Sequence, residues 1–251
     1  MIKIKSPQEI EIMQKGGKIL SDCLWQVMEN IKPGVSEIEL DELAERLILS
    51  KNGKPGFKEV EGYNNTICIS VNDVVVHGIP TKNKIKEGDI VGIDCGVYLD
   101  GFHTDMSESV AVGDSVDSSI KRFLDVGKKA LEAGISQAKV GNHVGDVSNA
   151  IQEIVEVQNG YSVVRSLVGH GVGQDLHEEP EVPGYVAGRI KESPILREGM
   201  VIAIEVIYNM GGPELTLDKD GWTLRTKDGR LSGLFERTVA ITKSGPLVLT
   251  P

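Results

Sequence analysis

The chain has 251 residues and a net charge of −10 near pH 7, and its length suits one large domain or two pseudo-symmetric halves. The acidic balance, with no block of Lys and Arg, excludes nucleic-acid binding through a phosphate footprint. Three cysteines without CxxC spacing exclude a disulfide framework and a thiolate zinc site. No long apolar segment predicts export or membrane insertion, so we expect a cytoplasmic protein.

Four helices are predicted from the spacing of apolar residues. Ser6 is placed as an N-cap with Pro7 in the first helical position, and Ser36 followed by Glu39 forms a capping-box pattern. Gly134 and Gly141 separate the last two helices. The predicted helices span 7–30, 36–49, 118–133 and 144–158.

Runs typical of β-strands follow each pair of helices. The predicted strands are 66–71, 74–76, a hairpin around 89–112, 162–167, 200–208, 222–226 and 234–242. An order of two helices and then strands, occurring twice, predicts a duplicated α+β unit around one curved sheet.

The hairpin carries the first candidate site. Asp100 and Gly101 form a strong turn signal, which would set Asp94 opposite Ser107 and Asp105 two residues away, on the same face. Two like charges on a half-buried face repel unless a cation lies between them. A single such aspartate could equally be solvated near a sheet edge, so the interpretation depends on the other segments.

Three of those segments add potential ligands. Glu205 and Glu236 each interrupt an apolar strand, where the simplest alternative is a salt bridge or an edge position. His170 lies between glycines, in what we expect to be an exposed loop. The spacing does not fit a dinucleotide-binding loop, and the HExxH pattern of zinc proteases fails because position 181 is Glu. Four carboxylates and one imidazole suit Mn, Fe(II) or Co better than Zn, and two ions balance the charge better than one, which indicates metal-assisted hydrolysis.

Over nearly its whole length the chain resembles the type I methionine aminopeptidases, metallopeptidases of the pita-bread fold. The segments that carry the resemblance are CISVNDVVVHGIP at 68–80, the hairpin, GHGVG at 169–173 with HEEP at 177–180, and KDGWT at 219–223. The resemblance implies an α+β fold, with pseudo-twofold halves around a curved antiparallel sheet, and one catalytic domain over 1–251. It also implies two divalent metal ions held by Asp94, Asp105, His170, Glu205 and Glu236.

The same resemblance assigns roles in removing the initiator methionine from nascent proteins with a small second residue. Asp94 and Glu236 would contact both ions, while His170 and Glu205 lie toward one of them. The implied catalytic residues are Glu205 as the proton shuttle, His177 as the group that stabilises the tetrahedral intermediate, and His77 beside the scissile bond. The implied substrate-binding residues are His77, Tyr63, Cys68, Trp222 and His177.

Four positions depart from the family pattern. Val60 and Leu176 stand where aromatic residues are usual, which leaves the breadth of specificity open. Val206 replaces a proline and Arg237 a histidine, each directly after a predicted ligand. Because neighbours on a strand point to opposite faces, we expect Arg237 to point away from the metal site.

Two alternative functions fit parts of the same pattern. An Xaa-Pro aminopeptidase or dipeptidase of the same fold shares the five ligands, but only about ninety residues precede Asp94, too few for the extra domain usual in those relatives. A non-catalytic peptide-binding module would be expected to have lost ligands. The expected partner is the N-terminal peptide of a nascent protein. We also expect a monomer without membrane association that makes a transient ribosome contact.

Overall fold

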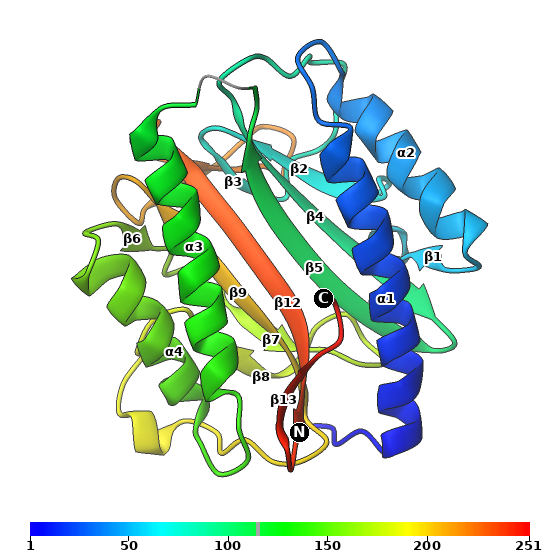
Figure 1. The fold of residues 1–251 in the computed structure, drawn as a ribbon, viewed down its shortest axis with the longest axis vertical. Helices are drawn as coiled ribbons and strands as arrows, with labels where there is room; N and C mark the ends of the chain where they lie inside the picture. The colour runs from blue at the N-terminus through cyan, green and yellow to red at the C-terminus, as the bar shows by residue number, and fades with distance from the viewer. Residues whose placement is uncertain (114–115) are drawn as a thin grey trace.

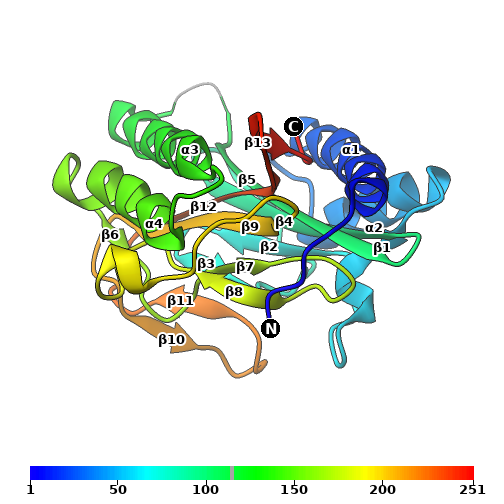
Figure 2. The same ribbon diagram turned by 90° about the horizontal axis from the view of Figure 1, so that it is seen from below.

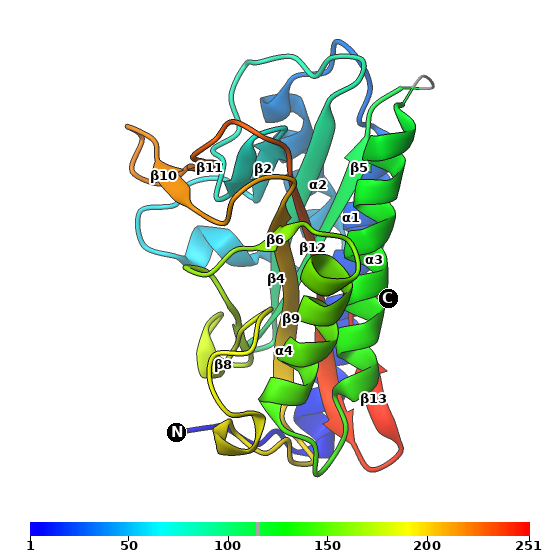
Figure 3. The same cartoon turned by 90° about the vertical axis from the view of Figure 1, so that its left-hand side faces the viewer.

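The computed structural model describes residues 1–113 and 116–251, in which a large curved sheet has all four α-helices on one face (Figures 1 and 3). The helices are α1 (Pro7–Glu29), α2 (Glu37–Ser50), α3 (Ser118–Gln137) and α4 (Val144–Gln152), with shorter turns η1 (Gly56–Glu59), η2 (Glu153–Val157) and η3 (Ile190–Glu192). No helix among the described residues is both long and apolar enough to cross a membrane.

Every strand pairing in the described residues is antiparallel. The main sheet has the order β1 (Lys54–Pro55), β4 (Ile90–Leu99), β5 (Phe102–Ala111), β12 (Ser232–Thr242), β9 (Val201–Asn209), β7 (Gly169–Gly171) and β8 (Glu178–Val182). Three further strands join it: β2 (Ile67–Val71) pairs with β4, β6 (Ser162–Val163) with β9 and β13 (Gly245–Val248) with β12. A small second sheet contains β10 (Leu215–Leu217), β11 (Leu224–Thr226) and β3 (Val74–Val76).

The helices divide into two pairs, each covering half of the sheet (Figure 1). Helices α1 and α2 pack on β2, β4 and β5 through one apolar cluster that includes Leu20, Leu40 and Ile93. Helices α3 and α4 pack on β9 and β12 through another that includes Phe123, Val147 and Phe235. The predicted α+β architecture with two halves around an antiparallel sheet is therefore confirmed.

The predicted N-cap at Ser6 and the predicted capping box at Ser36 are confirmed, and Glu9 completes a capping box at Ser6 that was not predicted. The Ser6 amide donates to the Glu9 carboxylate (2.7 Å), and the Glu9 amide donates back to the Ser6 hydroxyl (3.3 Å). At α2, the Glu39 carboxylate accepts from both the amide and the hydroxyl of Ser36. These bonds satisfy donors that the first helical turn leaves unpaired.

The prediction that Gly134 ends the third helix is wrong. Helix α3 continues through Gly134 to Gln137. The glycine allows close packing of two helices and does not end the helix. A Cβ at this position would lie 3.0 Å from Ile151 Cγ1 of α4. The missing side chain lets the two helices approach closely, and the chain turns instead at Gly141, where φ is +91°.

The strand predictions were right for the long strands and for the short strands β2 and β3, and poor for most of the other short strands. The hairpin turn is confirmed, with positive φ at both Asp100 and Gly101. The strand predicted at 162–167 is only Ser162–Val163. The strands β1, β7, β8, β10 and β13 were not predicted, since each has five residues or fewer and too little alternation to be recognised.

Candidate metal centre and substrate pocket

Four of the five predicted ligands lie on two neighbouring rows across the face of the sheet that the helices leave open, and the fifth joins them from β7. The first row follows the ladder pairs of β2, β4, β5, β12 and β9. It contains, in order, Cys68, Asp94, Ser107, Glu236 and Glu205. Residues directly opposite one another in a ladder share a face, so three predicted ligands point the same way.

The second row lies two residues further along the strands. The Thr238 hydroxyl accepts from the Asp105 amide and donates to the Asp105 carbonyl, at 2.9 and 2.8 Å. Thr238 pairs with Ala203, which pairs with His170. Potential ligand atoms of Asp105, His170 and Glu236 all lie within 4.8 Å of one another. Tertiary pairing therefore brings together residues from four strands.

The expectation that His170 lies in an exposed loop is wrong. It is buried in strand β7, between β8 and β9. The glycines on either side serve this packing, since a Cβ would lie 2.4 Å from the Ala203 carbonyl at Gly169 and 2.2 Å from the Glu179 carbonyl at Gly171. The ring Nδ1 lies 2.9 Å from the Gly171 carbonyl oxygen, which leaves Nε2 as the free ligand atom.

The cluster lacks protein partners for its negative charge. Asp94 Oδ1 and both carboxylate oxygens of Glu236 are buried without a hydrogen-bond partner in the part of the chain that the structure describes. Glu236 is 1% exposed and Asp105 is 4% exposed. A buried carboxylate without a partner is costly, so the donor set fits a bound cation.

The electrostatics of the cluster lead to the same conclusion. Burial raises the pKa of Asp94 to about 7, and burial with the charge of Asp94 raises the pKa of Glu205 to about 8. Burial and the neighbouring acids hold the pKa values of Asp105 and Glu236 well above the ordinary range. Burial and the nearby His177 lower the pKa of His170 to about 4, so its ring is a neutral ligand near pH 7.

Arg237 takes no part in this cluster, and the prediction that it points away is confirmed. Its guanidinium donates to Glu108 at 2.7 Å and lies over the ring of Trp25, on the helix-covered face. The ligand Glu236 and its neighbour Arg237 thus project to opposite sides of β12.

A cavity of about 140 Å³ adjoins the cluster and contains all the predicted substrate-binding residues. Its aromatic wall is formed by Phe57, Tyr63 and Trp222, with Tyr63 edge-on to both neighbours at centroid distances of 6.4 and 5.2 Å. Val60 and Leu176 also line it. Phe57 was missed from the sequence, because a lone aromatic in the short turn η1 belongs to no motif.

The two catalytic histidine candidates enter the same cavity from loops. His77 has a φ of +56°, uncommon for a residue with a side chain, and follows strand β3. His177 is exposed, and its ring centroid lies 4.3 Å from that of His170. Desolvation lowers the pKa of both rings, so both are neutral near pH 7.

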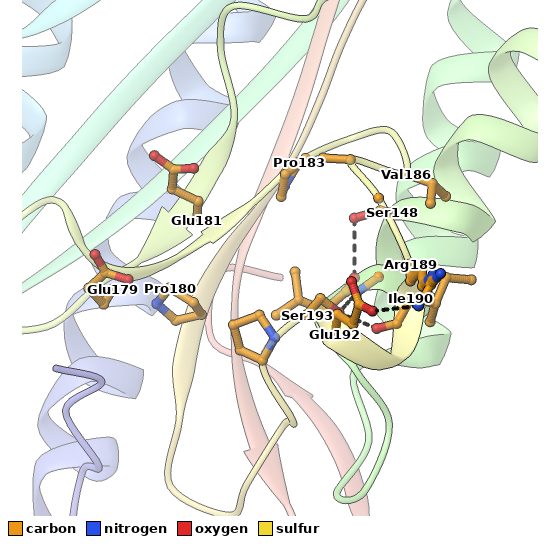
Figure 4. Close-up of a pocket in the computed structure, with 15 residues that line it drawn as sticks. Ser148, Glu179, Pro180, Glu181, Pro183, Val186, Arg189, Ile190, Glu192 and Ser193 are labelled. Carbon is orange, nitrogen blue, oxygen red and sulfur yellow. Dashed lines mark hydrogen bonds and ion pairs between the residues drawn. The ribbon is translucent and has the colours of Figure 1, made fainter.

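A second hollow, of about 510 Å³, lies between β8, the start of α4 and the segment 183–194 (Figure 4). Glu179 and Glu181 on its rim are exposed. Arg189 is paired with Glu192 at 3.1 Å, and both side chains are largely exposed. Solvated and already paired groups of this kind do not form the buried, convergent set found at the cluster.

Comparison with known proteins agrees with this geometry. Residues 11–243 match metallopeptidase family M24, the class that the fold and the acidic cluster define. The methionine aminopeptidase of Clostridium perfringens is 44% identical over 250 residues, covering 100% of this chain and 99% of the relative. The crystal structure of methionine aminopeptidase from Thermotoga maritima superposes with a TM-score of 0.95 at 41% identity, covering 100% and 99% of the two chains.

A prolidase from Pyrococcus furiosus shares the fold alone, with a TM-score of 0.77 at 24% identity, and 65% of that chain is covered. This chain belongs to metallopeptidase family M24, among the methionine aminopeptidases.

Proposed function

We propose that this protein is a metal-dependent aminopeptidase that removes the initiator methionine from nascent proteins with a small second residue. The observation that carries the proposal is the arrangement of the cluster. Asp105, His170 and Glu236 have potential ligand atoms within 4.8 Å of one another, and Asp94 and Glu205 line the adjoining aromatic-walled cavity, which is large enough for one side chain. The names of relatives that match the full length of the chain support the same activity.

Two divalent ions would be held by the five residues described above. Asp94 and Glu236, which flank Ser107 in the first row, would serve both ions, and His170 and Glu205 would serve one of them. When bound, such ions lower the pKa of water and polarise a carbonyl group. Oxygen-rich ligand sets favour Mn, Fe(II) or Co over Zn.

The remaining chemistry comes from the side chains in the cavity wall. Glu205 belongs to the cluster and also lines the cavity, so its carboxylate faces both the expected metal ligands and the peptide. It therefore suits the transfer of a proton to the leaving amine. His177 on the rim can donate to the oxygen of the tetrahedral intermediate, and His77 can bind the peptide beside the scissile bond.

The methionine side chain would occupy the space between Tyr63, Cys68 and Trp222. The Tyr63 hydroxyl donates to the Ile67 carbonyl at 2.8 Å, which fixes the ring edge-on to Trp222. Thioether sulfur packs favourably against aromatic edges. Phe57 adds an aromatic surface that Val60 and Leu176 do not provide, which supports retained selectivity for methionine.

Hydrolysis of matched peptides by chelator-treated protein tests the proposal directly. The panel contains peptides that begin Met-Ala, Leu-Ala and Ala-Pro, with Mn, Co, Fe(II) or Zn added back separately. We expect metal-dependent release of methionine alone. Release of leucine would show a relaxed pocket, and cleavage of Ala-Pro would indicate an Xaa-Pro peptidase. Inactivity throughout would indicate a non-catalytic peptide-binding module.

We further propose that residues 1–251 act as one catalytic domain, as a cytoplasmic monomer with at most a transient ribosome contact. The full-length match to relatives supports the single domain. Gel filtration of the metal-loaded protein tests the oligomeric state, and co-sedimentation with ribosomes tests the contact.

A further inference from the structure

The N-terminal segment 1–6 lies against the loop between β7 and β8, which carries Leu176 and His177 (Figures 2 and 3). Its backbone is fixed where the Lys5 amide donates to the Gly199 carbonyl at 2.7 Å. Lys3 and Asp175, which are 172 positions apart in the sequence, thus meet beside the cavity.

Two lysines of this segment bind acidic residues on either side of His177. Lys5 Nζ lies 2.6 Å from Glu178 Oε2, and the two side chains are only 4% and 2% exposed. Lys3 Nζ lies 3.1 Å from the other Glu178 oxygen and 2.6 Å from Asp175. Burial alone would raise the pKa of Glu178, but the hydrogen bonds and charges of the lysines outweigh it and lower the pKa. Glu178 is therefore ionised at neutral pH.

The loop backbone is fitted closely around this ion pair. A Cβ at Gly173 would lie 2.5 Å from Lys5 Cε and 2.7 Å from Glu178 Oε1, so a side chain at this position would displace the ion pair. The Gly173 carbonyl accepts from the His103 amide of β5 at 2.7 Å. The loop is thereby held at both ends by contacts outside itself.

His177 depends on this support. Its ring packs on His170 and the residue is otherwise exposed, so the direction of the side chain follows from the position of its backbone. A misplacement of about 1 Å can lower a rate roughly 10²-fold, even when the altered residue is remote from the chemistry.

We infer that Lys5 is a positioning residue: its buried ion pair with Glu178 fixes the loop that presents His177 to the scissile bond. The inference rests on the proposed aminopeptidase function. It assigns a catalytic consequence to the N-terminal segment, which contributes no residue to the cavity itself.

Kinetics of Lys5→Met, with Lys3→Met as the matched control, provide the first test. For a Met-Ala peptide at saturating metal, we expect Lys5→Met to lower kcat roughly 10- to 10²-fold. Bound metal should not change, and KM should change much less than kcat. Lys3→Met should retain near-normal kcat, because that lysine and Asp175 are largely exposed. Equal losses in both variants would overturn the inference.

A double-mutant cycle separates positioning from a general structural role. If Lys5 acts through His177, Lys5→Met should cause little further loss of kcat in a His177→Ala protein. The same fold loss in both backgrounds would show that Lys5 acts independently of His177 and would overturn the inference.

Two additions keep the test decisive if Lys5→Met does not fold or the peptides are not cleaved. Glu178→Gln keeps the shape and a hydrogen-bond acceptor, and its smaller loss of kcat should likewise vanish in the His177→Ala background. Hydrogen–deuterium exchange of residues 172–178 should accelerate in this variant and not in Lys3→Met. An inactive wild-type protein would contradict the proposed function, whereas unchanged exchange would contradict only the positioning role of Lys5.

Discussion

The two faces of strands β5 and β12 differ in whether their buried carboxylates have cationic partners. On the helix-covered face, Glu108 is 2.7 Å from the Arg237 guanidinium and 3.3 Å from Lys128 Nζ. On the other face, Asp105 and Glu236 are equally buried, yet neither has a lysine or arginine within salt-bridge distance among the residues described. Both faces belong to the same two strands, and the buried side chains on both are carboxylates.

The difference shows that burial of a carboxylate does not by itself indicate a metal site. Glu108 lies in the same strand as Asp105, but alternation turns it to the helix-covered face, where Arg237 of β12 and Lys128 of α3 supply cations. On the open face, the charged or imidazole neighbours of these carboxylates among the described residues are further acids and a neutral imidazole. The first arrangement is electrostatically complete within the protein, and the second requires a ligand.

The largest expected effect comes from removing a charge on the open face. Asp94→Asn should lower peptide hydrolysis by at least roughly 10³-fold, more than the loss of one oxyanion donor, because it replaces a central ligand. Bound metal, measured by elemental analysis of the purified protein, should fall with it. Near-normal turnover would refute the assigned cluster.

His177→Ala tests whether chemistry on the open face extends beyond the ligands. We expect kcat to fall roughly 10²- to 10³-fold, the scale of a lost oxyanion donor, while metal content stays normal. Steady-state kinetics and metal analysis on the same preparation distinguish the roles. Loss of metal would make His177 a ligand instead.

Arg237→Met breaks the arrangement on the helix-covered face. Leaving Glu108 buried with only the more distant Lys128 should destabilise the fold, by up to about 3–5 kcal/mol for a fully uncompensated charge. Urea denaturation measures this loss. Metal affinity per folded molecule should be retained, and a variant that loses metal without losing stability would contradict the separation of the two faces.

The smallest expected effect is the pH dependence of stability. The folded-state pKa values of Asp94 and Glu205, about 7 and about 8, lie above ordinary values. The folded metal-free protein therefore binds more protons than the unfolded chain from about pH 4 to 8, so its stability should fall as pH rises through that window. Thermal unfolding at pH 5.5 and 8 measures the change in Tm.

Metal-loaded protein provides the control for the pH experiment. Metal ligands must be deprotonated, so the rise in Tm on adding metal should be larger at pH 8 than at pH 5.5. A metal-free Tm that stays constant or rises with pH would contradict the raised carboxylate pKa values.

Much of the fold could be predicted because its long elements carry strong local signals. The N-cap at Ser6, the capping box at Ser36 and the Asp100–Gly101 turn act over three or four residues, and each was placed correctly. The short strand β7 could not be found, since two of its three residues are glycines. Its conformation is set by contacts with β8 and β9. The pairing with β8 is irregular in register, and β9 is distant in sequence.

The candidate site was predicted in part from patterns and in part from resemblance. Asp94 and Asp105 could be placed on one face because the hairpin register follows from a two-residue turn. Nothing local indicates that Glu205 lies opposite Glu236. Their strands, β9 and β12, are neighbours in the sheet but are separated in the sequence by β10 and β11. The four carboxylates and His170 were grouped from their residue types and positions in the sequence, and the likeness to known aminopeptidases implied the same set.

By itself, the sequence determined the helices, the long strands, the hairpin and the five ligand types, because these depend on short-range periodicity, turns and caps. Only the tertiary structure decided that His170 is buried, that Phe57 completes the cavity wall and that Lys5 reaches Glu178. Each of these depends on which distant segments share a surface. That choice is made by the packing of the whole sheet, which no local pattern encodes.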